Sequence, residues 1–125
     1  MVGVVVGGVS VAPQAAAQQW YIDHVAWTSY GAGRTSLRIY PTPAGRRASG
    51  IGNEASGRQA WAQVLALAPD ADTPGMYSQF LCHWEFSEAV MPGKISWNIE
   101  PWRPVVDDAT MVMTRCNPGG EQEPF

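Results

Sequence analysis

The sequence is poor in several residue types on which common catalytic and metal sites depend. Its 125 residues include one lysine (Lys94), two histidines (His24 and His83) and two cysteines (Cys82 and Cys116). It contains no GxSxG, HExxH, CxxC or phosphate-binding glycine motif, the signatures of serine hydrolases, zinc proteases, dithiol redox enzymes and nucleotide-binding proteins. The sequence therefore indicates none of these classes, and we expect no cofactor.

Basic charge and long apolar runs are scarce as well. The net charge of −3 argues against nucleic acid as a partner, because binding to phosphates needs a basic surface. The apolar stretch at residues 2–11 is shorter than the roughly 20 residues that span a bilayer, so we expect no transmembrane segment. Five arginines lie within residues 34–58, and this part could attract an anion, although a solvated surface of mixed charge is the simpler explanation.

The N-terminal 17 residues have the pattern of a secretory signal peptide. A short apolar run is followed by Ala15, Ala16 and Ala17, the small residues that signal peptidase favours, so the mature chain is expected to begin at Gln18. No lysine or arginine precedes the run, which leaves open a truncated signal or an apolar tail on a cytosolic protein. We expect a globular domain at residues 18–118, a flexible acidic tail at 119–125, and a secreted or cell-envelope location.

The two cysteines predict one disulfide. An even pair in an exported chain is typical of a structural bridge, here between Cys82 and Cys116. A metal site is the rival interpretation. It would need both histidines as further ligands, and the adjacent Cys82 and His83 are sterically awkward on one zinc ion. We therefore expect no bound metal.

The first half of the chain predicts a β-hairpin followed by a helix. Apolar and polar residues alternate over residues 20–29 and 35–40, the pattern of two strands, with a glycine-rich turn between them. Residues 41–53 are rich in proline and glycine and predict a loop. Ser56 and Gln59 have the spacing of a capping box, so a helix is expected from there to Ala68.

The second half predicts another helix and two strands. Thr73 and Pro74 resemble a helix start, and residues 76–86 fit a helix somewhat better than a strand. Alternation predicts strands at residues 94–100 and 110–116. The fold class expected is α+β, a small, largely antiparallel sheet packed against one or two helices and held by one disulfide. Its core should include Trp61, Trp97 and Ile99.

Three segments carry residues that could bind or catalyse. His83, one turn after Gln79 and beside Cys82, could act as an acid or base. In the segment 97–104, Glu100 precedes Pro101 and Arg103 lies between Pro101 and Pro104, so the backbone of both residues is restricted. The segment also contains Asn98 and Trp102. The proline-braced loop at 41–47 could present Arg46 to an anion. Structural roles explain each equally simply: a hydrogen-bonded His83, a Glu100–Arg103 pair and a solvated loop.

A relation between these segments follows if the disulfide forms. Cys116 then lies near His83, and the strand before it carries Glu100. Strands that are close in sequence are usually neighbours in the sheet, so we expect Glu100 and Arg103 to lie near His83. A carboxylate beside the imidazole would raise its pKa.

The order of these features resembles a known family. The chain is similar to domain of unknown function 2599 in the following features: a first strand with tryptophan, Pro41-Thr42 with Arg46, Trp61, Cys82-His83, the run Trp97-Asn98-Ile99-Glu100-Pro101-Trp102-Arg103-Pro104 and the ending Cys116-Asn117-Pro118. The resemblance covers residues 21–118. It implies a secreted protein of a high-GC Gram-positive bacterium, supports the Cys82–Cys116 pairing and marks His83, Glu100 and Arg103 without giving their roles.

Two functions are compatible with the sequence. The first is an exported binding or interaction module whose ligand belongs to the cell envelope or the extracellular space; the tryptophans and the missing catalytic motifs favour it. The second is a small secreted hydrolase or toxin-like enzyme in which His83 and Glu100 act as acid and base, with Arg103 or Arg46 holding an anion.

Overall fold

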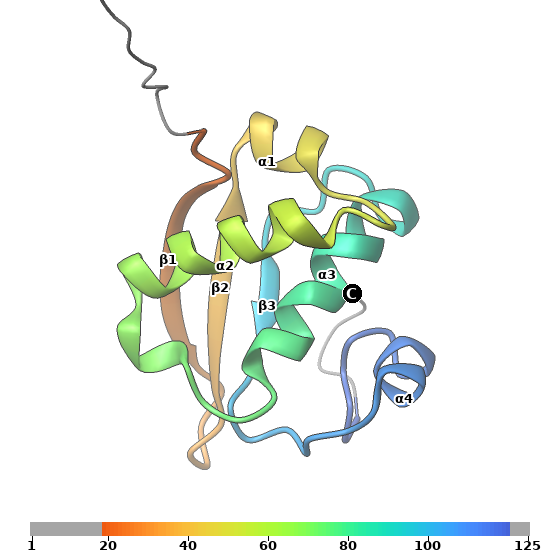
Figure 1. Ribbon diagram of the computed structural model, residues 1–125. Coiled ribbons are helices and arrows are strands. Elements are labelled where there is room, and N and C mark those ends of the chain that lie inside the picture. Colours follow the sequence, from red (N-terminus) through yellow and green to blue (C-terminus); the bar gives the residue numbers. More distant parts are fainter. Residues whose placement is uncertain (1–18, 121–125) are drawn as a thin grey trace, which may run out of the picture.

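A three-stranded antiparallel sheet and the helices on one of its faces make up the fold (Figure 1). The structure is a computed structural model that describes residues 19–120. The strands β1 (Ile22–Ser29), β2 (Thr35–Pro41) and β3 (Trp97–Ile99) follow one another across the sheet, with β2 in the centre. The predicted α+β class is confirmed. The expected signal peptide and residues 121–125 of the expected tail lie outside the described residues.

The β1–β2 hairpin is confirmed, with Val25 opposite Ile39 and Trp27 opposite Leu37. These four side chains share one face, because side chains separated by two residues point the same way along a strand. The helices α2 (Glu54–Leu67) and α3 (Met76–Val90) lie in front of that face in Figure 1.

The core fills the space between the sheet and these two helices. The predicted core residues Trp61, Trp97 and Ile99 are all buried, so this prediction is confirmed. The rings of Trp84 and Trp97 meet edge to face, with their centroids 5.9 Å apart. Aromatic pairs in this geometry add to the free energy gained by burying their area.

Helix boundaries differ from the sequence predictions in three places. The expected loop contains a helix, α1 (Pro43–Ala48), in which the Thr42 hydroxyl accepts a hydrogen bond from the N–H of Gly45. Proline at the first helical position favours a helix. Pro43 therefore indicated α1, although its segment was predicted as a loop. Helix α2 begins at Glu54 rather than at Ser56, and α3 begins after Gly75, whose φ of 86° only glycine adopts readily.

The C-terminal half departs most from expectation. The predicted strand at 110–116 is wrong: this segment contains the helix α4 (Asp108–Met113), and the Asp107 side chain accepts from the N–H of Thr110 at its start. Met111 is buried while Met113 is 83% exposed, so alternation in the sequence did not reflect a sheet face. The strand expected at 94–100 shortens to β3. None of the helices within residues 19–120 is long and apolar enough to cross a membrane.

The close approach of α2 and α3 gives a test of the packing. A Cβ added at Gly57 would lie 2.9 Å from Cδ1 of Trp84 and 3.0 Å from Cδ1 of Leu81. We expect Gly57→Ala to lower the free energy of unfolding by roughly 1–3 kcal/mol through overpacking, although alanine is the better helix former. Urea denaturation measures this, with the exposed Gln59→Ala as control. A stabilised Gly57→Ala protein would contradict the packing.

Candidate functional site

Two of the residues that the sequence singled out, Glu100 and Arg103, belong to a buried network of polar side chains. Arg103 Nε donates to Oε1 of Glu100 at 2.6 Å, and the Ser36 hydroxyl donates to Oε2 of the same carboxylate at 2.5 Å. Glu100 is 2% exposed and Arg103 is 3% exposed. Arg103 Nη1 also donates to the carbonyls of Pro118 and Gly120. The pair therefore fastens the chain after β3 to the C-terminal part of the described chain.

Neighbouring side chains hold the same network in place. The Gln79 amide donates to the carbonyl of Glu100 at 2.9 Å and accepts from its N–H at 2.8 Å. One side chain thereby satisfies the main chain just beyond β3, where no further strand pairs. The guanidinium groups of Arg34 and Arg103 lie 4.8 and 4.4 Å from the ring centroid of Trp102, and the indole N–H of Trp102 donates to the carbonyl of Thr35. These contacts position the backbone around Glu100, while Arg103 and Ser36 donate to its carboxylate.

His83 lies in the interior and does not pair with Glu100. Its Nδ1 is 2.9 Å from the Ser87 hydroxyl, and Nε2 makes no well-formed hydrogen bond within the described part of the chain. The pKa of His83 is lowered from 6.5 to about 3, mainly because the ring is buried; the charges of Lys94 and Arg103 also lower it, while the backbone of Asn98 acts in the opposite direction. The expectation that the pKa of His83 is raised is therefore wrong, because the loss of hydration on burial is the largest effect and lowers this pKa.

The neutral state of His83 gives a pH prediction. Its folded pKa lies below the value of 6.5 in the unfolded chain, so the unfolded chain binds more protons between pH 3 and 6.5. The free energy of unfolding should therefore be highest, as far as His83 is concerned, above pH 6.5. Between pH 6.5 and 3 it should fall by at most about 1.4 kcal/mol for each unit by which the pH drops. Urea titrations from pH 4 to 7 measure this slope.

The control for this experiment is the other histidine. The exposed His24 lies on β1, where Nδ1 is 2.6 Å from Asp23. We expect His83→Gln to remove most of the slope and His24→Gln to keep it. An NMR titration in which the His83 ring becomes protonated near pH 6 would show that the ring is hydrated in solution.

The other proposed binding residues also have internal partners. Arg46 donates to Oε1 of Glu88 at 3.0 Å and to the carbonyl of Lys94 at 2.6 Å. Asn98 is buried, and its side-chain oxygen accepts from the Ser96 hydroxyl at 2.8 Å. The structure thus brings Glu100 and Arg103 together and places Arg46 in a separate contact.

The predicted disulfide is present and connects two helical segments. Cys82 of α3 bonds to Cys116, which follows α4, with Cα atoms 5.6 Å apart. Met111 of α4 packs against this bridge, together with the half-buried Phe86, Met91 and Val106. The bridge and this small apolar cluster hold α4 against α3.

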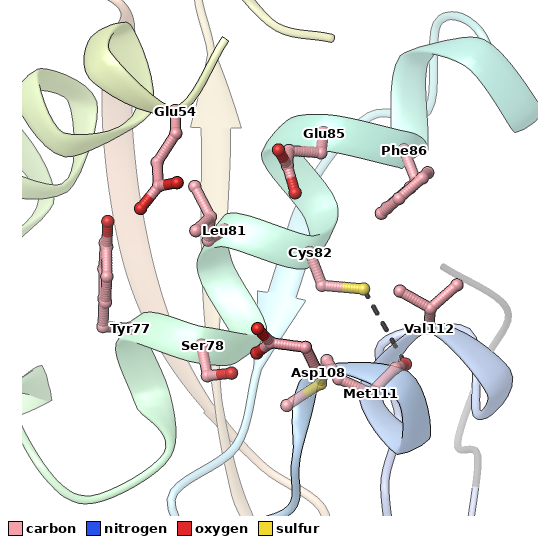
Figure 2. Close-up of a pocket in the computed structure, with 10 residues that line it drawn as sticks. All are labelled: Glu54, Tyr77, Ser78, Leu81, Cys82, Glu85, Phe86, Asp108, Met111 and Val112. Carbon is pink, nitrogen blue, oxygen red and sulfur yellow. Dashed lines mark hydrogen bonds between the residues drawn. The ribbon is translucent and has the colours of Figure 1, made fainter. Parts of the chain in front are cut away.

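A pocket opens where α4 meets α2 and α3 (Figure 2). Its volume is about 350 Å³, within the range of small-ligand sites. Figure 2 shows the carboxylates of Glu54, Glu85 and Asp108, one from each of three helices, pointing into the same hollow. The remaining lining residues are mostly apolar or aromatic: Tyr77, Ser78, Leu81, Cys82, Phe86, Met111 and Val112.

The pocket is electronegative. Three acidic side chains line it and no basic one does. Burial raises the pKa of Tyr77, Glu54 and Glu85 raise it further, and Arg58 partly offsets them. No group of three histidine, cysteine or acidic side chains within residues 19–120 could hold a metal ion, because the carboxylates surround the hollow without converging on one point.

Sequence reasoning missed this pocket. Its acidic residues Glu54, Glu85 and Asp108 are not among the candidate residues that the sequence singled out. One signal was available: Tyr77, Leu81 and Glu85 recur every four residues and therefore share a face of α3. The contact between this face and α4 could not be predicted, because the segment that forms α4 was predicted to be a strand.

Comparisons with known proteins identify relatives but no activity. The family model described as "Protein of unknown function (DUF2599)" matches residues 22–119. An uncharacterized protein of Mycobacterium tuberculosis is 53% identical over 104 residues, 83% of this chain and 70% of the relative. One from Mycobacterium leprae is 44% identical over 99 residues, 79% of this chain and 80% of the relative. No solved structure matches the chain.

Proposed function

We propose that this chain, which belongs to the DUF2599 family of proteins of unknown function, is an exported binding module of the bacterial envelope or the extracellular space. The observation that carries the proposal is the contrast between two groups of polar residues. Glu100 and Arg103 are buried and hydrogen-bonded within the protein. Glu85 and Asp108 line an open pocket instead. Groups with spare hydrogen-bonding capacity at a pocket are the ones available to a ligand.

The disulfide supports export. Structural disulfides persist in oxidising compartments and are rare in the bacterial cytosol, and Cys82–Cys116 holds one wall of the pocket. N-terminal sequencing of the protein from a culture supernatant tests this part of the proposal. We expect the chain to begin at Gln18. Recovery from the cytosol alone, with residues 1–17 attached, would contradict export.

A map of ligand contacts tests the binding function. The isotopically labelled mature protein is titrated with fractions of culture supernatant and envelope extract, and backbone amide shifts are recorded by NMR. We expect the shifts to cluster at the pocket, at Ser78, Glu85 and Val112. Shifts confined to the sheet, or no shifts with any fraction, would contradict the pocket as the binding site.

The hydrolase alternative gains no support from this geometry. A general base must reach the substrate and be basic at the working pH, whereas His83 is buried and holds a proton only near pH 3. Both oxygens of Glu100 already accept hydrogen bonds. A substrate would have to displace these contacts from the interior of the fold.

A further inference from the structure

We infer that the pocket between α2, α3 and α4 binds a lysine or arginine side chain presented by a polypeptide. This inference rests on the proposed binding function and adds the chemistry of the ligand. Its premises are the charge of the pocket, the apolar wall beneath the carboxylates and the exposed apolar surface beside them.

The charge of the pocket is only partly compensated, by Arg58 beside Glu54. Within residues 19–120, neither Glu85 nor Asp108 forms a hydrogen bond or ion pair with another side chain, and Glu54 is 3.5 Å from Arg58 in an exposed pair. Exposed pairs of this kind contribute about 0–1 kcal/mol, so Glu54 remains available. A cation entering the pocket therefore gains charge-assisted hydrogen bonds without first breaking strong ones.

The shape of the pocket favours an organic cation over a metal ion. The carboxylates come from three helices and do not converge as metal ligands. The lining also includes Leu81, Phe86 and Met111, which can contact the methylene stem of a lysine or arginine while the charged end reaches a carboxylate. Long cationic side chains bind in this divided manner, with the stem on apolar surface and the head in a polar environment. Phe86 and Tyr77 add aromatic surface suited to a cation.

The surroundings of the pocket favour a polypeptide over a free small amine. Val112 lines the pocket and is 44% exposed, and the next residue of α4, Met113, is 83% exposed. A peptide can place its basic side chain in the pocket and neighbouring apolar side chains on α4. A free diamine would gain only the contacts inside a volume of about 350 Å³.

Binding of defined probes tests the inference. The probes are blocked hexapeptides with one lysine or one arginine between leucines, the same peptide with uncharged norleucine, and 1,5-diaminopentane, each titrated by NMR at low salt. We expect the basic peptides to shift the amides of Ser78, Glu85 and Val112, to bind at least about tenfold more tightly than the norleucine peptide, and to weaken as salt is added.

Charge-removing variants provide the matched control. Glu85→Gln combined with Asp108→Asn should weaken the basic peptides by about tenfold or more, while Asp72→Asn, which neutralises an exposed carboxylate outside the pocket, should not. Within residues 19–120 neither Glu85 nor Asp108 forms a side-chain hydrogen bond, and Asp108 lies in the first turn of α4, where its negative charge stabilises the helix modestly. The double variant should therefore lower the thermal midpoint only slightly and stay folded at the temperature of the titration.

Several results would overturn the inference. Equal binding of the norleucine peptide would exclude recognition of charge, and equal binding of the diamine would exclude the polypeptide source. Self-association that the pocket variants abolish would make a second copy of the chain the occupant. Failure of all probes, with pocket shifts still caused by native fractions, would refute the cationic ligand and leave the proposed function standing; absence of shifts in both experiments would refute both.

Discussion

Replacing both bridged cysteines, Cys82→Ser with Cys116→Ser, is expected to lower the free energy of unfolding by about 4 kcal/mol. The bridge closes a loop across 34 positions of sequence, and cross-linking a loop of that length restricts the unfolded chain by about this amount. Small domains have total stabilities of roughly 5–15 kcal/mol, so the loss is a large fraction. Urea denaturation of wild type and variant without reductant measures the difference.

The control for the disulfide experiment is chemical reduction. With reductant, wild type should approach the variant, because only the covalent link distinguishes them. Hydrogen exchange should locate the loss at α4, whose six residues are too few to be stable as an isolated helix. Equal midpoints without reductant would show that the apolar packing of Met111 alone holds α4.

The parts of the fold that sequence predicted are those fixed by local pattern. The hairpin followed from strict alternation on both sides of a glycine turn, and Trp61 shared a helix face with other apolar residues. Helix α4 was missed because alternation over seven residues also arises in a short helix with one buried side chain, Met111. The cap at Asp107 was the better signal, since a cap specifies the direction of the backbone and alternation does not.

The candidate site shows where a single sequence stops being informative. Residues 97–104 were marked for their composition, and the pairing of Glu100 with Arg103 was among the outcomes considered. Burial could not be foreseen: in the strand predicted at 94–100, Ser96, Asn98 and Glu100 alternate with apolar residues and so belong to its polar face, yet all three are buried. The pocket depends on residues from three helices, and their assembly is a property of tertiary packing.

The buried pair also explains why these residues resemble a catalytic site in sequence without facing a substrate. A carboxylate and a guanidinium removed from water are tolerated when they pair with each other and most of their remaining hydrogen-bonding groups find partners. Ser36 and the carbonyls of Pro118 and Gly120 are such partners for the Glu100 carboxylate and for Arg103 Nη1, whereas Arg103 Nη2 is buried without a hydrogen bond within residues 19–120. The network joins β2, the segment after β3 and the C-terminal part of the described chain, so its role here is to hold three distant segments together.

The substitution Glu100→Gln is therefore expected to lower the free energy of unfolding by about 3–5 kcal/mol, because it leaves the Arg103 guanidinium buried without a counter-charge. Arg103→Met should cost a similar amount by stranding the Glu100 carboxylate. Urea denaturation measures both. If Glu100→Gln is too unstable to purify, the difference can be measured on Glu100→Asp, which keeps the charge and shortens its reach.

The double variant separates an ion pair from two independent residues. Glu100→Gln with Arg103→Met removes both charges, so its cost should be well below the sum of the two single costs, by more than the roughly 0.5 kcal/mol within which independent sites add. Additive costs would mean that the two side chains do not interact in solution. A Glu100→Gln protein of unchanged stability that had lost an activity would instead assign Glu100 to catalysis, because a residue that serves chemistry rather than packing can be neutralised without cost to the fold.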